Sequence, residues 1–187
     1  MSEFDPQTWV NRAWERHHKR VAGKSAEKRL IEAKKLTVDL DSISGIEAVV
    51  AWCAFRRIRV VFTTKSGGIY DPGLGEIHIN SRQSIENQLY TLLHECGHLL
   101  IDDRSQTTEF RFRKGYYVLD EVVRKSFVHR VSIVDEEFEA WARGRKLARK
   151  LGVKINDDVF DELKAKFLKS YMLWAVGDPN YQTSGPK

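Results

Sequence analysis

Hydrophobic and polar positions along the chain predict a polar helical arm, then a helix and two strands. Residues from about Pro6 to Lys35 have helical character but few apolar contacts, which is typical of a peripheral helix. The apolar run IEAVVAWCAF predicts a second helix that starts at Ser44. The run RVVFTT at residues 59–64 is rich in β-branched and aromatic side chains, and EIHIN at residues 76–80 alternates apolar with polar ones. Both runs predict strands, which could pair as an antiparallel ribbon.

Three further helices are expected in the second half of the chain. Ser81 or Ser84 can cap a helix that runs to about Ile101 and is apolar over much of its second half. Apolar positions at a period near 3.6 predict a helix over residues 133–151 and another over residues 157–175. The pattern therefore predicts a mainly helical protein with little sheet.

One folded domain is expected between two peripheral segments. The 187 residues are enough to bury a sizeable core, and no internal repeat, low-complexity tract or linker divides the chain. We expect a polar helical arm at residues 1–40, the domain at residues 41–177 and a tail at residues 178–187.

The composition favours a cytoplasmic protein that has no contact with a membrane. Cys53 and Cys96 are the two cysteines, too few for a disulfide framework. No apolar run approaches the length that spans a bilayer, and the first twenty residues lack the apolar core of a signal peptide. The formal net charge of +5 is mild, with basic residues concentrated at 12–35 and 143–154. These are either solvated helix faces or, in the arm, a site of weak nucleic-acid binding.

The segment YTLLHECGHL places three titratable side chains in an otherwise apolar helix. On a helix, His94 and His98 lie on one face, one turn apart, which aims two imidazoles at one point. Glu95 lies about 100° around the helix from His94, where it can reach a metal-bound water as a general base. Hydrogen bonds to backbone could also satisfy such residues, but one divalent cation organises all three together.

A catalytic zinc needs a third protein ligand and an open position for water. On a helical wheel centred on Val134, Glu137 borders the apolar stripe of residues 133–151, whereas Glu136 and Glu139 fall on the polar face. We therefore expect Glu137 to be the third ligand, with Glu136 and Glu139 as the alternatives. Asp102, four residues after His98, could fix the tautomer of a ligand imidazole.

These motifs resemble the zincin-like metallopeptidases of the ImmA/IrrE type, which are common in bacteria and their phages. The resemblance covers residues 68–151: EIHIN leads into TLLHECGHLL, and a later helix has a glutamate three residues before a small residue. It implies an α+β, zincin-like fold, mainly helical with a small antiparallel sheet preceding the HExxH helix. It also implies a Zn²⁺ cofactor, held by His94, His98 and a glutamate that here is Glu137, ahead of Ala140.

The function expected from these residues is that of a zinc-dependent endopeptidase, a hydrolase acting on a cytoplasmic protein or peptide. The metal and Glu95 would activate the attacking water, and Tyr116 or Tyr117 could stabilise the oxyanion. The alternative is a non-catalytic regulator that is stabilised by metal and binds nucleic acid or a protein through its basic surface.

Overall fold

A computed structural model describes residues 26–64, 68–105 and 126–181. Its elements are four α-helices, three strands and one 3₁₀ turn: α2 (Ala26–Phe55), β1 (Arg59–Thr63), β2 (Ile69–Asp71), β3 (Glu76–Asn80), α3 (Ile85–Ser105), α5 (Phe127–Leu151), α6 (Asp157–Ala175) and η1 (Pro179–Tyr181). The fold is therefore α+β and mainly helical, as the sequence predicts. Within the described ranges, no helix combines the length and apolar character that crossing a bilayer requires.

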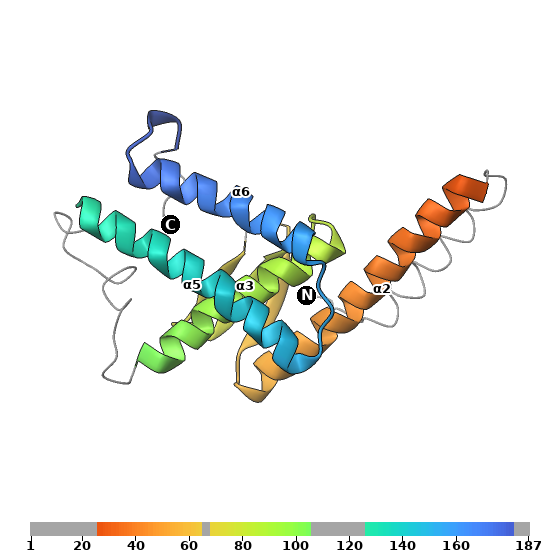
Figure 1. The fold of residues 1–187 in the computed structure, drawn as a ribbon. Helices are drawn as coiled ribbons and strands as arrows, with labels where there is room; N and C mark the ends of the chain where they lie inside the picture. The colour runs from red at the N-terminus through yellow and green to blue at the C-terminus, as the bar shows by residue number, and fades with distance from the viewer. Residues whose placement is uncertain (1–25, 65–67, 106–125, 182–187) are drawn as a thin grey trace.

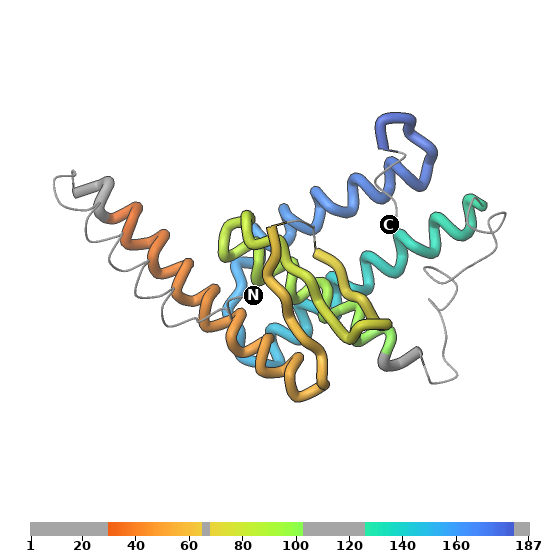
Figure 2. Tube along the Cα trace, turned by 180° about the vertical axis from the view of Figure 1, so that it is seen from behind, coloured from red at the N-terminus to blue at the C-terminus, as the bar shows by residue number. Residues whose placement is uncertain are grey.

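Helix α3 lies at the centre of the fold, between the sheet and helix α5. Figure 1 shows α5 crossing α3, with α6 next to α5. Figure 2 shows the three strands side by side, on the side of α3 opposite to α5. All of these elements contribute to one core. Its fully buried members include Val49, Cys53, Ile77, Ile79, Leu89, Leu92, Leu93, Cys96, Trp141, Ala148 and Phe160.

The sheet is mixed, so the predicted antiparallel ribbon of residues 59–64 and 76–80 is wrong. Strand β3 is central and pairs in parallel with β1 and antiparallel with β2, in the order β1-β3-β2. The reason is β2, a three-residue strand that reverses the chain direction before β3 begins. Of the two strand pairings in the described part of the chain, the β2–β3 hairpin is the antiparallel one.

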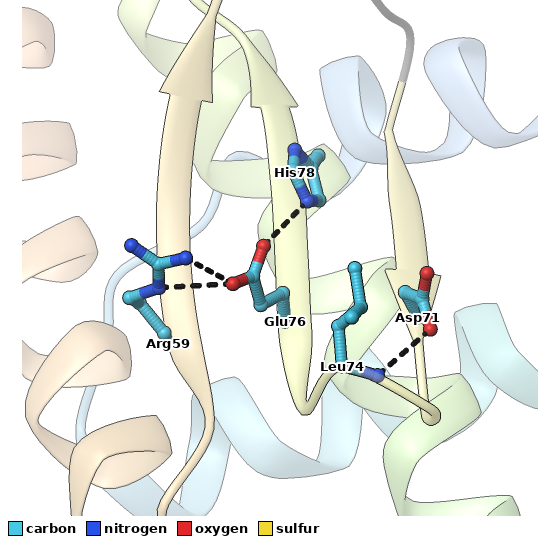
Figure 3. Close-up of polar contacts among 5 residues, drawn as sticks. All are labelled: Arg59, Asp71, Leu74, Glu76 and His78. Carbon is cyan, nitrogen blue, oxygen red and sulfur yellow. Dashed lines mark hydrogen bonds and ion pairs between the residues drawn. The ribbon is translucent and has the colours of Figure 1, made fainter.

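The two faces of the sheet follow the alternation of β3. Ile77 and Ile79 are fully buried, whereas Glu76 and His78 lie on the opposite face. There the Glu76 carboxylate accepts hydrogen bonds from Arg59 of β1 and contacts His78 at 2.9 Å (Figure 3). In the β2–β3 turn, the Leu74 N–H donates to the Asp71 carboxylate at 3.0 Å (Figure 3). The apolar face of the sheet is thereby directed towards α3.

Helix α2 is longer than the sequence pattern predicts. It runs without a break from Ala26, although a separate helix was expected to start at Ser44. Ser42 and Gly45 are poor helix formers, but both lie where α2 packs: Ser42 is buried, and a Cβ on Gly45 would contact Leu89 of α3. The first half of α2 projects from the other elements (Figure 1). The helix crosses the expected boundary at residue 40, and the division into arm, domain and tail stays a prediction.

N-terminal capping residues mark where the remaining helices begin. Ser84 caps α3, because its Oγ accepts a hydrogen bond from the Asn87 N–H at 3.3 Å. Ser126 caps α5 in the same way, so this helix begins at Phe127 and not near residue 133 as expected. The bounds expected for α6, 157–175, are confirmed.

Two glycines bring the backbones of α3 and α5 into direct contact. A Cβ on Gly97 of α3 would lie 2.0 Å from the carbonyl oxygen of Ala140, and one on Gly144 of α5 would lie 2.4 Å from that of Leu93. Only glycine fits at such separations. This close crossing places residues 94–98 of α3 directly against residues 136–141 of α5.

Candidate metal centre

The two histidines of the HExxH motif face each other on α3. Their Nε2 atoms are 3.3 Å apart, and their ring centroids are 4.7 Å apart. His94 is buried, and His98 is nearly so. The spacing of four residues on a helix thus brings the two imidazoles together, as the sequence predicts.

Helix α5 contributes a carboxylate to the same point. Glu137 is 1% exposed, and its Oε2 and Oε1 lie 3.2 Å from His94 Nε2 and 3.5 Å from His98 Nε2. At metal–ligand distances of about 2.0 to 2.1 Å, neighbouring ligand atoms of a tetrahedron lie about 3.3 to 3.4 Å apart. Two nitrogens and a carboxylate with this spacing form a group that can hold a metal ion.

Burial and the neighbouring charges shift the pKa values of this group. Burial would lower the pKa of His98, but the carboxylates of Glu137 and Glu136 outweigh it and raise that pKa well above its usual value. Burial likewise opposes the charge of Glu137, yet His98 and His94 bring its pKa well below the usual range. A proton and a divalent cation therefore compete for the same buried electron pairs.

Glu95 lies beside this group under the backbone that enters β2. A Cβ on Gly68 would lie 2.6 Å from Glu95 Oε1, so the glycine lets the chain pass directly over the carboxylate. The backbone N–H of Tyr70 donates a hydrogen bond to Glu95, and burial raises the pKa of the carboxyl group above its usual value. A carboxyl group with a raised pKa exchanges protons more readily near neutral pH.

The structure separates the three neighbouring glutamates of α5. Glu139 accepts a hydrogen bond from Arg143 at 2.8 Å, on the polar side where the wheel placed it. Glu136 is 8% exposed and its Oε1 lies 3.5 Å from His98 Nδ1, so its expected place on the polar face is wrong. Within the described ranges, His94, His98 and Glu137 are the three residues whose ligand atoms converge.

Trp141 packs against His94. The two rings are stacked with centroids 4.4 Å apart and an interplanar angle of 24°. His94 Nδ1 and Trp141 Nε1 are both buried, and neither has a hydrogen-bond partner among the residues that the structure describes. Stacking therefore restricts the orientation of His94.

Other residues near the motif have roles that the sequence pattern did not show. Asp102 accepts a hydrogen bond from the Tyr70 hydroxyl at 3.3 Å, and it is Glu136 that faces the second nitrogen of His98. Tyr70 was missed because β2 is so short, although Asp71 before Pro72 favours extended backbone there. Tyr116 and Tyr117 lie outside the described residues.

A small mixed sheet packed on an HExxH helix, with a glutamate supplied by a following helix, has the organisation of a zincin-like metallopeptidase. The family model for the IrrE N-terminal-like domain, peptidase M78, matches residues 58–171. The match spans most of the chain, and the protein belongs to this family. Comparisons with curated proteins and with solved structures found no significant match.

Proposed function

We propose that this protein is a cytoplasmic, zinc-dependent endopeptidase in which His94, His98 and Glu137 hold the metal. The convergence of these side chains at the spacing of a tetrahedral site is the observation that carries the proposal. When bound, zinc supplies a Lewis acid that polarises the scissile carbonyl and acidifies water. Two imidazoles and one carboxylate are a donor set of catalytic zinc sites, which leave a position open.

Glu95 has the role of general base in this proposal. It follows His94 directly, so it lies outside the three ligands but beside them, buried under Gly68. Its carboxylate accepts a proton from the attacking water and delivers it to the leaving amine. The hydrogen bond from the Tyr70 N–H restricts the orientation of this carboxylate.

The experiment compares Glu95→Gln with Glu137→Gln. Glu95→Gln keeps the size of the side chain but removes its basicity, so zinc content should be unchanged while turnover falls roughly 10²-fold or more. Glu137→Gln should lose zinc itself, because an amide is a poorer zinc ligand than a carboxylate. The substrate is a protein that co-purifies with Glu95→Gln and is cleaved by the wild type.

Two outcomes would contradict the proposal in different ways. Wild-type protein that binds no zinc, and is not stabilised by adding it, would contradict the metal site. Full zinc content and activity in Glu137→Gln would show that another residue is the third ligand. If Glu139→Gln lost its zinc instead, Glu139 would be that ligand. Glu95→Gln with wild-type turnover would show that another group is the base.

A further inference from the structure

Two successive glutamates of α5 lie against opposite nitrogens of one imidazole. Glu137 Oε1 faces His98 Nε2, and Glu136 Oε1 faces His98 Nδ1, each at 3.5 Å. Successive residues project about 100° apart around a helix, so the two carboxylates reach opposite edges of the ring. His98 is therefore contacted by α5 on both of its nitrogens.

The second ligand histidine is held differently. His94 has no hydrogen-bond partner for Nδ1 within the ranges that the structure describes, and it is oriented by stacking on Trp141. Both histidines use Nε2 towards Glu137. The carboxylate at Nδ1 thus distinguishes His98 from His94.

The burial of Glu136 also calls for an explanation. A carboxylate removed from water is costly unless it is paired, and Glu136 is 8% exposed. The group that faces it is the imidazole of His98. A neutral imidazole carries a hydrogen on one nitrogen only, and a hydrogen on Nδ1 leaves the Nε2 lone pair for a metal.

We propose that Glu136 is a positioning residue that holds His98 with its Nδ1–H directed at the Glu136 carboxylate and its Nε2 directed at the metal. This inference rests on the proposed function, because it takes His98 to be a ligand. A carboxylate behind a ligand imidazole fixes its tautomer and its ring orientation and makes the ligand more basic. Loss of such a partner typically lowers metal affinity about 10- to 100-fold.

The test measures zinc affinity by competition with a chelator for wild type, Glu136→Gln and Glu139→Gln. Glu139 is the matched control: it lies one turn further along α5 and pairs with Arg143, away from the imidazoles. Glu136→Gln should bind zinc about 10- to 100-fold more weakly than wild type, and Glu139→Gln should bind it normally. Equal affinity in Glu136→Gln and wild type would overturn the inference.

A spectroscopic measurement on the wild type makes the test independent of how the variants fold. In zinc-loaded protein with ¹⁵N-labelled histidine, His98 should show a hydrogen-bonded Nδ1–H, and Glu136→Gln should weaken that hydrogen bond. A hydrogen on Nε2 of His98 in the wild type would overturn the inference. Complete loss of zinc in Glu136→Gln, equal to that in Glu137→Gln, would also overturn it by making Glu136 a ligand. Wild-type protein without zinc affinity would instead refute the proposed function on which the inference rests.

Discussion

Replacing Gly97 with alanine tests whether the close crossing of α3 and α5 sets the geometry of the site. The new Cβ would lie 2.0 Å from the carbonyl oxygen of Ala140 and 2.6 Å from its carbonyl carbon. These are backbone atoms and cannot rotate away. The two helices must therefore separate locally by about 1 Å, because interiors are too closely packed to absorb such an overlap.

The expected loss of stability combines two opposing effects. Overpacking of a core costs about 1 to 3 kcal/mol, and contact with fixed backbone favours the upper end of that range. Alanine regains roughly 1 kcal/mol of helix propensity relative to glycine. We expect Gly97→Ala to lower the free energy of unfolding by about 2 kcal/mol, measured by urea denaturation of metal-free protein.

The same shift should weaken metal binding. Glu137 lies one turn before Ala140 on α5, so separating the helices moves its carboxylate away from His94 and His98. A displacement of about 1 Å exceeds the tolerance of roughly 0.2 Å in metal–ligand distances. Zinc affinity, measured by chelator competition, should therefore fall with stability.

Gly45→Ala is the matched control for Gly97→Ala. Its Cβ would lie 2.9 Å from methyl groups of Leu89 and Val153, and these side chains can rotate. We expect a change in stability of less than about 1 kcal/mol and unchanged zinc affinity. If Gly97→Ala matched Gly45→Ala in both measurements, the backbone contact would not determine the site.

Further predictions concern the ligands, pH, a buried hydroxyl and the basic arm. His94→Ala or His98→Ala should abolish zinc binding and remove the rise in melting temperature that zinc gives the wild type. The folded-state pKa of His98 is raised, so its contribution to the free energy of unfolding is complete below about pH 6.5 and is lost as pH rises through the raised value. Urea denaturation with chelator between about pH 6 and pH 9 should show that decline, and His98→Gln should flatten it. Tyr90→Phe leaves the Asn156 N–H without its acceptor and should cost about 1 to 3 kcal/mol in the same assay. DNA binding by the full chain should be weak and steeply salt-dependent, and tight sequence-specific binding would favour the regulator hypothesis.

The sequence predicted the elements whose signals are local. The spacing of the HExxH motif brought His94 and His98 together, and α6 occupies the expected residues because Asn156 caps a strongly amphipathic segment. The resemblance to ImmA/IrrE-type proteins is confirmed by the family match. The direction of strand pairing could not be predicted, since alternation identifies a strand such as residues 76–80 but not its partner.

The inward face of α5 shows why the wheel failed for Glu136. The wheel was centred on Val134, and Phe138 lies about 40° from Val134 on it, yet Phe138 is 42% exposed. The buried face includes Ala140 and Gly144, small residues that carry little hydrophobicity and pack through their backbone. A wheel based on hydrophobic side chains therefore placed the centre of the buried face of α5 too close to Phe138. Glu137 bordered the expected face and lies inside the observed one, whereas Glu136 lies inside the observed face alone.

The two glycine contacts also explain how a buried cluster of ionisable groups keeps its geometry. Gly97 immediately precedes His98, and Gly144 contacts Leu93, which immediately precedes His94. Each contact is made by backbone atoms next to a histidine, so the separation of α3 and α5 is set independently of the side chains that bind. Glu137 then reaches both imidazoles because the two helices are this close. The site is therefore preorganised, and metal binding does not have to bring α3 and α5 together.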